Sequence, residues 1–344
     1  MRILLTGSDG YIGCLLGPML LEQGHDVVGL DTGYYRDGWL YSEPRLRRYP
    51  AQLNKDLRHV TREDLQGMDA VVHLAELSND PLGKNNPENT YRINHQGSVR
   101  LAALAKEAGV RRFVYASSCS VYGVGSDDFR TEEAATNPQT AYGKCKVLVE
   151  RDVGLMADDD FSPTFLRNAT AYGASPRMRF DIVLNNLCGL AWTTGKIKMI
   201  SDGTPWRPLV HVLDICDAII CALRAPVDAV HNQVFNVGGN EENYRVREIA
   251  EIVGGVFPGC EVTLGDNGGD NRSYRVSFDK IHDRLPGFEC KRSAEWGARQ
   301  LRELFERIDM TPETFEFRAF TRLKQLEYLI RTRQLDAEFF WRQA

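Results

Sequence analysis

The stretch TGSDGYIG occupies residues 6–13 and follows the apolar run RILL at 2–5. Its three glycines allow a tight turn, the approach of a diphosphate to backbone N–H groups, and close packing of a helix on a strand. Asp31 ends the next apolar run, where a carboxylate can bind the ribose diol of an adenosine. These residues predict a dinucleotide-binding loop, and the charge of Asp31, which repels a 2′-phosphate, favours NAD over NADP.

Short apolar runs alternate with amphipathic segments through the first half of the chain. This alternation predicts a doubly wound α/β fold with a parallel sheet and right-handed crossovers. Strands are expected at 2–5, 26–30, 70–74, 112–116 and 164–167, and helices at 11–23, 88–108 and 141–156.

The second half of the chain is less regular, and its 344 residues allow two unequal lobes. A short strand at 234–237 can rejoin the main sheet, and a helix is expected at 214–224 with Asp214 as its N-cap. The tail from residue 293 onward has helical spacing. We therefore expect an NAD-binding domain at 1–173 that 212–240 rejoins, a substrate lobe at 174–211 and 241–310, and a helical tail at 311–344.

The composition argues against several functional classes. With a net charge of −5, the chain lacks the clustered positive charge of a general nucleic-acid surface. No two of its eight cysteines form a CxxC pair, and no histidine stands at metal-ligand spacing from a cysteine. Both observations argue against a metal site. No apolar run is long enough to cross a membrane, and an N-terminal strand leaves no room for a signal peptide. We expect a cytoplasmic protein with reduced thiols and no metal, nucleic-acid or membrane partner.

Tyr142 and Lys146 form a Tyr-x-x-x-Lys motif within an expected helix. Residues four apart share one face of a helix, so the Lys146 ammonium can lower the pKa of the Tyr142 phenol. A phenolate near neutral pH can take the proton of a substrate hydroxyl as hydride leaves the carbon that bears it. Ser118 stands two residues after the strand expected at 112–116 and can steady that hydroxyl.

In this order, the motifs resemble those of the extended short-chain dehydrogenases/reductases of the NAD-dependent nucleotide-sugar epimerase/dehydratase family. The resemblance covers roughly residues 1–305. The matching residues are Thr6-Gly7-x-x-Gly10-x-x-Gly13, Asp31, Asp56-Leu57, His73-Leu74-Ala75, Asn94, Ser118, Val121-Tyr122-Gly123, Tyr142-x-x-x-Lys146, Arg207-Pro208-Leu209-Val210-His211-Val212-x-Asp214 and Phe235-Asn236-Val237-Gly238-Gly239.

The resemblance implies a Rossmann domain with a smaller C-terminal α/β substrate lobe, a retained NAD, a nucleotide diphosphate sugar as substrate, and a homodimer. It implies Ser118, Tyr142 and Lys146 as the catalytic triad. The residues expected to bind the cofactor are Gly7, Asp9, Gly10, Tyr11, Ile12, Gly13, Asp31, Asp56, Leu57, Leu74, Ala75, Asn94, Ser117, Tyr142 and Lys146. For Asp56 a second interpretation is equally good, since its side chain can cap a helix.

The substrate lobe needs cationic groups for a diphosphate, and arginine forks match phosphate best. Arg207 aligns with the family's phosphate-binding arginine, and Arg272 is a second candidate, although it can equally be a solvated surface charge. The residues expected to contact the substrate are Glu76, Ser78, Asn79, Ser118, Cys119, Ser120, Thr170, Asn186, Arg207 and Arg272.

Three departures from the family pattern bear on the reaction. Cys119 and Ser120 stand where dehydratases of the family usually have Asp-Glu and where decarboxylases have a Glu at the second position, and neither replaces a carboxylate well. Glu76 stands where the family commonly has an alanine. Three roles are open for it: a contact to the sugar, a proton carrier, or simply a hydrogen-bonded carboxylate in a loop. Thr170 stands where the family usually has Asn, which alters the expected hydrogen bonding around the sugar and allows a sugar that is unusual for the family.

These features favour epimerisation of a nucleotide sugar at C4, through a transient 4-keto intermediate and with Tyr142 as acid and base. The alternatives within the family are a dehydratase, a decarboxylase or a 4-ketoreductase that uses Glu76 or Cys119. A non-catalytic NAD-binding scaffold of the same fold is a further alternative, and the intact Ser118, Tyr142 and Lys146 argue against it.

Overall fold

The computed structural model describes residues 1–42, 48–78, 86–266 and 272–342. Seven parallel strands form the central sheet, in the order β11-β7-β5-β4-β1-β2-β3. Their bounds are Arg2–Thr6 (β1), Asp26–Asp31 (β2), Ala51–Asn54 (β3), Ala70–His73 (β4), Arg112–Ser118 (β5), Ser162–Asn168 (β7) and Gln233–Val237 (β11). The strand order reverses between β1 and β4, where a doubly wound sheet opens a crevice at the carboxyl ends of its strands. The expected doubly wound α/β fold is confirmed.

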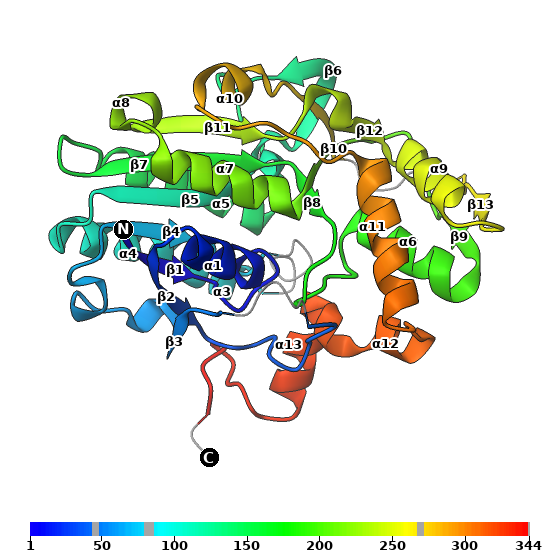
Figure 1. The fold of residues 1–344 in the computed structure, drawn as a ribbon, viewed down its shortest axis with the longest axis horizontal. Helices are drawn as coiled ribbons and strands as arrows, with labels where there is room; N and C mark the ends of the chain where they lie inside the picture. The colour runs from blue at the N-terminus through cyan, green and yellow to red at the C-terminus, as the bar shows by residue number, and fades with distance from the viewer. Residues whose placement is uncertain (43–47, 79–85, 267–271, 343–344) are drawn as a thin grey trace.

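Helices cover both faces of the sheet (Figure 1). Ile3 and Leu5 of β1 belong to one apolar cluster, which includes residues of α1 (Gly13–Glu22) and α7 (Val212–Arg224). Leu4 belongs to a second cluster, with residues of α4 (Ser98–Glu107) and α5 (Ala141–Gly154). Successive residues of a strand point to opposite faces, so all three leucine and isoleucine side chains are fully buried. Burial on both faces explains the continuous apolar runs in the sequence.

The second lobe is built from three longer helices and several short strands (Figure 1). The helices α6 (Val183–Thr194), α9 (Val246–Val256) and α11 (Ala294–Arg307) pack against one another. The strands pair as β8-β10-β12, β9 with β13, and β6 with β14. Their bounds are Val124–Arg130 (β6), Thr170–Tyr172 (β8), Lys196–Lys198 (β9), Trp206–His211 (β10), Asn243–Arg245 (β12), Glu261–Thr263 (β13) and Ser273–Val276 (β14).

Short helical segments connect the larger elements. Two of them are the short helices α8 (Val227–Val230) and α10 (Asp279–Arg284). The 3₁₀ turns in these connections are Leu57–His59, Glu63–Leu65, Cys119–Tyr122 and Asn240–Glu242. In the described part of the chain, no helix is both long and apolar enough to cross a membrane.

The helix expected at 88–108 is divided into three segments. It consists of α3 (Pro87–Thr90), a π-helical segment at Tyr91–Gly97, and α4. The Ser98 hydroxyl donates a hydrogen bond to the Asn94 carbonyl at 2.5 Å. Within the wider turn, the Asn94 amide exchanges hydrogen bonds with both backbone groups of Leu77, at 2.9 and 3.1 Å. Hydrophobic spacing alone does not distinguish such a turn from a regular helix.

The helix expected at 214–224 begins two residues earlier, as α7, and the expectation that Asp214 is its N-cap is wrong. The imidazole of His211 takes this place, because its Nδ1 accepts a hydrogen bond from the Leu213 N–H at 3.2 Å. Asp214 is fully buried inside the first turn and forms an ion pair with Arg292. Its carboxylate also accepts hydrogen bonds from the backbone N–H groups of Lys291 and Arg292.

The C-terminal tail is helical only in part. It contains α12 (Pro312–Glu316), a 3₁₀ turn at Arg318–Phe320 and α13 (Arg322–Arg331), and the described residues after 331 form no helix. In Figure 1 this orange-to-red part of the chain lies on the side of the sheet that ends in β3. It contacts the loop after β2, where the Tyr34 hydroxyl donates to the Phe339 carbonyl at 2.5 Å and Trp341 Nε1 donates to the Thr32 carbonyl at 2.7 Å.

A buried ion pair fixes α5 against the sheet. Glu150 of α5 accepts hydrogen bonds from the guanidinium of Arg167 in β7, the shortest at 2.7 Å, and from the Ser117 hydroxyl of β5 at 2.5 Å. The Glu150 and Arg167 side chains are only 8% and 7% exposed. Because a buried charge is stable only beside its partner, this pair is expected to hold α5 in place.

We expect Glu150→Ala to lower the free energy of unfolding by about 3 kcal/mol, because it leaves the Arg167 guanidinium buried without its counterion. Chemical denaturation followed by circular dichroism would measure the change. Glu303→Ala, on an exposed position of α11, is the matched control and should change stability by less than about 0.5 kcal/mol. Equal effects of the two substitutions would contradict the role given to the ion pair.

Candidate active site

A cavity of about 720 Å³ opens at the carboxyl ends of the central strands and extends to the second lobe. It brings together the glycine loop, the ends of β2, β4, β5 and β7, the start of α5, and residues of the second lobe and the tail. Among the residues expected at the site, those that line it are Gly7, Gly10, Tyr11, Ile12, Gly13, Asp31, Asp56, Leu57, Leu74, Ala75, Glu76, Ser78, Ser117, Ser118, Ser120, Tyr142, Lys146, Thr170, Arg207 and Arg272.

The glycine loop leaves no room for side chains where it meets the sheet. Gly7 has φ +71°, and a Cβ atom there would lie 2.8 Å from the Ala75 nitrogen. A Cβ atom on Gly13 would lie 2.1 Å from the Gly7 carbonyl oxygen, at the start of α1. Bare backbone at a helix start is what the diphosphate of a dinucleotide requires, so the loop fits such a cofactor.

Asp31 and Asp56 are the residues expected to bind the adenosine part of the cofactor, and both line the cavity. The two carboxylate oxygens of Asp31 accept hydrogen bonds from the backbone N–H groups of Gly33 and Asp9, at 2.7 and 3.1 Å. Burial raises the pKa of Asp31, although these N–H groups oppose the effect. Asp56 caps the 3₁₀ turn at Leu57–His59 through the Arg58 N–H, at 2.8 Å, and it also lines the cavity.

The helix α5 presents Tyr142 and Lys146 to the cavity. Thr140 caps its first turn, because the Thr140 hydroxyl oxygen accepts a hydrogen bond from the Gly143 N–H at 3.1 Å. The Lys146 ammonium lies 5.2 Å from the centre of the Tyr142 ring and donates a hydrogen bond to the Ala116 carbonyl at 2.5 Å. Spacing of four residues thus places both groups on one face, as a pair of phenol and cation requires.

Glu76 is the anion beside Lys146. Its Oε2 lies 2.6 Å from the Lys146 ammonium, and its Oε1 accepts a hydrogen bond from the Tyr115 hydroxyl at 2.5 Å. The Lys146 and Glu76 side chains are 4% and 2% exposed. Burial alone would lower the pKa of Lys146, but the charge of Glu76 and the Tyr142 phenol raise it above its ordinary value. Lys146 therefore remains an ammonium at neutral pH.

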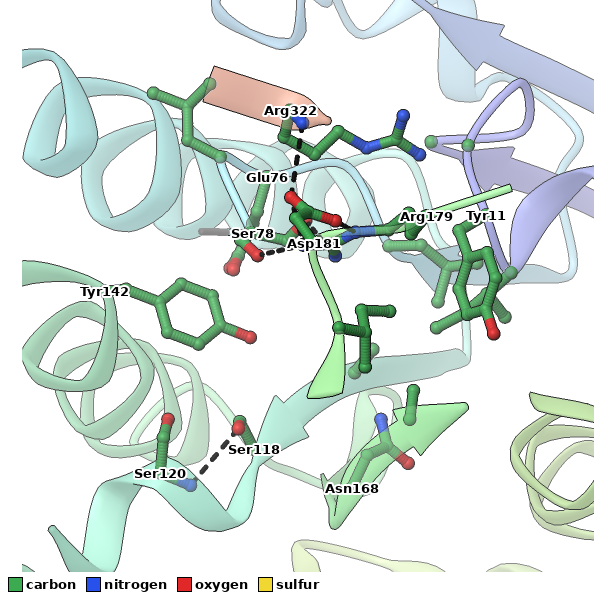
Figure 2. A pocket seen from close by; sticks show the side chains of 18 of the residues that line it. Tyr11, Glu76, Ser78, Ser118, Ser120, Tyr142, Asn168, Arg179, Asp181 and Arg322 are labelled. Carbon is green, nitrogen blue, oxygen red and sulfur yellow. Dashed lines mark hydrogen bonds and ion pairs between the residues drawn. The ribbon is translucent and has the colours of Figure 1, made fainter. Parts of the chain in front are cut away.

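Ser118 and Ser120 face Tyr142 across the cavity (Figure 2). The Ser118 hydroxyl oxygen accepts a hydrogen bond from the Ser120 N–H at 3.2 Å. The Ser120 hydroxyl has no hydrogen-bond partner among the described residues, and neither does the side-chain oxygen of Asn168. These groups can bind the oxygen atoms of a substrate that enters between them and Tyr142.

Cys119 points away from the cavity. Its thiol is fully buried and donates a hydrogen bond to the Arg167 carbonyl at 3.1 Å. Burial raises the pKa of the Cys119 thiol far above its ordinary value, so the group is neither a proton donor nor a thiolate at neutral pH. The 3₁₀ turn at Cys119–Tyr122 causes this separation, because its first two side chains point in different directions.

Three further residues expected at the site also lie outside the cavity lining. Asp9 forms ion pairs with Arg177 and Arg36, at 2.6 and 3.3 Å. Asn94 holds the backbone of Leu77, and Asn186 donates its side-chain N–H to the Phe180 carbonyl at 3.0 Å. Asn79 lies outside the described residues.

The two expected arginines, Arg207 and Arg272, also line the cavity. Arg207 donates hydrogen bonds to the carbonyls of Trp206, at 2.8 Å, and Arg272. Nearby, His211 is buried and bonded to Gln300 at 2.9 Å, and burial lowers the pKa of His211 to about 4, so it is a neutral structural group. No cluster of metal-ligating side chains occurs in the described ranges, and all eight cysteines are free thiols.

Sequence reasoning did not identify several residues that line the cavity. Asn168 stands two residues before Thr170, which is itself among the residues expected to contact the substrate. Arg179, Asp181 and Arg322 form a charged group above Tyr142 in Figure 2. Arg179 pairs with Asp181 at 2.9 Å and donates to the Ser78 hydroxyl at 3.1 Å. No local signal in the sequence identifies Arg322, because only tertiary packing brings the tail to the cavity.

Comparison with known proteins shows what this arrangement resembles. A UDP-glucose 4-epimerase of Lactobacillus helveticus is 28% identical over 306 residues, which cover 83% of this chain and 91% of that protein. A UDP-glucose 4-epimerase of Bacillus subtilis (strain 168) is 30% identical over 270 residues, which cover 69% of this chain and 77% of that protein. The solved structure of MoeE5 in complex with UDP-glucose and NAD is 27% identical, with a TM-score of 0.75, and covers 90% of this chain and 100% of that one.

The family match agrees with the geometry of the cavity. The glycine loop and the pair of Tyr142 and Lys146 both lie within residues 3–238. Those residues match the model of the NAD dependent epimerase/dehydratase family and make up more than half of the chain. The chain therefore belongs to the NAD dependent epimerase/dehydratase family.

Proposed function

We propose that this protein is an NAD-dependent nucleotide-sugar 4-epimerase. The observation that carries the proposal is the meeting of Ser118, Tyr142 and Lys146 in one cavity with the glycine loop, without acidic side chains at positions 119 and 120. The similarity to UDP-glucose 4-epimerases supports UDP-hexoses as the first substrate class to test. When bound, NAD supplies the reversible acceptance and return of a hydride.

Tyr142 is the acid and base in this proposal. The Lys146 ammonium favours the phenolate form, which takes the proton of the sugar 4-hydroxyl and later returns a proton to the same oxygen. Ser118 and Ser120 hold that oxygen by hydrogen bonds. Turning of the 4-keto sugar between the two proton transfers exposes its other face and inverts the configuration at C4.

Elimination or decarboxylation is disfavoured by the available proton carriers. Removal of water needs both an acid and a base beside the sugar. Cys119 faces away from the cavity, and a serine hydroxyl is a poor acid. The carboxylate of Glu76 has no proton of its own, and it could take one up and pass it on only by giving up its contact with Lys146 or Tyr115.

Arg207 and Arg272 are proposed to bind the diphosphate of the sugar nucleotide, because both line the cavity and arginine forks match phosphate oxygens. The remaining site assignments are Gly7, Gly10, Tyr11, Ile12, Gly13, Asp31, Asp56, Leu57, Leu74, Ala75 and Ser117 toward the cofactor, and Ser78 and Thr170 toward the sugar. Glu76 is assigned to Lys146 instead of the sugar.

The enzyme is expected to interconvert UDP-glucose and UDP-galactose without net production of NADH. Proton NMR of the anomeric signals, recorded for a panel of nucleotide sugars that includes UDP-glucuronate, would identify the product. Tyr142→Phe should lower kcat by at least about 100-fold, because it removes the acid and base. Tyr49→Phe, on a half-exposed tyrosine outside the cavity lining, is the control and should retain full activity.

Several outcomes would contradict the epimerase proposal. Accumulation of stoichiometric NADH would indicate a net oxidation, and release of water or carbon dioxide would indicate a dehydratase or a decarboxylase. Full activity of Tyr142→Phe would remove the proposed role of the phenol. Absence of any reaction across the panel would favour a non-catalytic NAD-binding protein.

Glu76→Gln should move the whole pH profile of kcat to lower pH, by about one unit. The substitution removes a negative charge 2.6 Å from Lys146, and loss of an anion lowers the pKa of neighbouring acids. The acidic limb, set by Tyr142, and the basic limb, set by Lys146, should therefore shift in the same direction. Glu107→Gln, at an exposed position of α4, is the control; an unshifted profile for Glu76→Gln would contradict the assignment.

A homodimer and a cytoplasmic location are further proposals, supported by the family resemblance. Sedimentation equilibrium of the purified protein should then give twice the mass of one chain. A single-chain mass across the micromolar range would contradict the dimer.

A further inference from the structure

Residues 318–341, which we call the tail segment, are fixed to the dinucleotide-binding half of the molecule. Gln325 Nε2 donates to the Tyr34 carbonyl at 3.0 Å, and Arg58 donates to the Glu338 carbonyl at 2.8 Å. An apolar cluster joins the two parts through Tyr34, Leu77, Ile93, Leu326, Leu329, Leu335 and Phe339. These contacts determine where α13 begins and where its first residue, Arg322, enters the cavity.

The guanidinium of Arg322 is buried and has no polar partner among the described residues. The residue is 3% exposed, and its guanidinium carbon lies 4.0 Å from the centre of the Tyr35 ring. Across the described ranges of the chain, the guanidinium has no hydrogen bond and no ion pair within 4.0 Å. Burial and the nearby Arg179 lower the pKa of Arg322 to about 10. An uncompensated buried charge is unfavourable, so this position favours an anion.

The carboxylates near Arg322 are engaged with other groups. Asp181 is paired with Arg179 at 2.9 Å, and it accepts a hydrogen bond from the backbone N–H of Arg322 at 3.2 Å. Asp31 accepts hydrogen bonds from the backbone N–H groups of Asp9 and Gly33. Asp181 and Asp31 therefore attract Arg322 only through space, and among the described residues no carboxylate forms an ion pair with its guanidinium.

The glycine loop lines the same cavity and indicates which anion belongs there. In Figure 2 the Arg322 side chain extends from α13 toward the side on which Tyr11 of the loop lies, whereas Ser118 lies across the cavity. The loop offers bare backbone at the start of α1, as a diphosphate requires. An arginine fork matches phosphate oxygens, so both features suit the same group.

We propose that Arg322 is a ligand of the diphosphate of the bound dinucleotide, and that the tail segment thereby helps to retain the cofactor. Arg322 lies outside residues 3–238, which match the family model, so the matched region does not include this ligand. The proposal rests on the binding of NAD and not on which sugar reacts. The role proposed for Arg322 can therefore be tested by NAD binding even if the protein does not epimerise any sugar.

The test compares Arg322→Met with the unchanged protein after bound NAD has been removed. Titration calorimetry should show that NAD and ADP-ribose bind about 10- to 100-fold more weakly to the variant, because a charge-assisted hydrogen bond is lost. Adenosine, which has no diphosphate, should bind equally to both proteins. The NAD-free variant should be at least as stable as the unchanged protein, because methionine fills the space without a buried charge.

Two further variants make the result decisive. Arg331→Met, at an exposed position of the same helix, should leave NAD affinity unchanged, and Arg322→Lys should recover part of it. Unchanged NAD affinity in Arg322→Met would overturn the proposal. So would a loss confined to UDP-glucuronate, which would assign the arginine to a sugar carboxylate. A destabilised NAD-free Arg322→Met, with no recovery in Arg322→Lys, would show a structural role and overturn it as well.

Discussion

A buried ammonium group at the carboxyl end of β5 is the constraint on which the site depends. Lys146 is almost fully enclosed, so its charge needs the Ala116 carbonyl, the Glu76 carboxylate and the faces of two tyrosine rings. The Ala116 carbonyl and the Tyr115 ring come from β5, Glu76 comes from the loop after β4, and the Tyr142 ring comes from α5 itself. The sheet, the helix and the loop after β4 must therefore be in register before the charge can be buried, which links the correct fold directly to the position of Tyr142.

The same requirement explains the distribution of charge around the cavity. Glu150 compensates Arg167 beneath the site, Glu76 compensates Lys146 beside it, and Asp181 compensates Arg179 above it. Each buried cation thus has a carboxylate of its own, and the pairs hold elements from separate parts of the chain together. Arg322 is the exception among these buried cations. Three of the buried cations are neutralised by carboxylates of the protein itself. The remaining one, Arg322, is the cation that we propose to be neutralised by the diphosphate of the bound dinucleotide.

The sequence allows prediction of whatever depends on local spacing. Apolar runs identify the strands, and the interval of four residues places Tyr142 and Lys146 on one face of α5. For features that depend on tertiary packing, the sequence gives no prediction or a wrong one. Neighbours that are distant in sequence determine three such features. These are the π-helical turn at Tyr91–Gly97, the capping of α7 by His211, and the direction of the buried Cys119 side chain away from the cavity. Arg322 is the extreme case, since it reaches the cavity only through the fold of the tail.

The direction of the Cys119 side chain sharpens the chemical argument. The sequence alone shows that two carboxylates are absent after Ser118, and a thiol could still have replaced one of them. The structure removes that possibility, because the buried thiol donates a hydrogen bond to the carbonyl of Arg167 in β7. Ser120 remains in the cavity with its hydroxyl unbonded among the described residues. Such a site has one strong proton carrier, Tyr142, together with groups that bind oxygen. One carrier suffices to remove and restore a proton at the same oxygen, whereas elimination needs two.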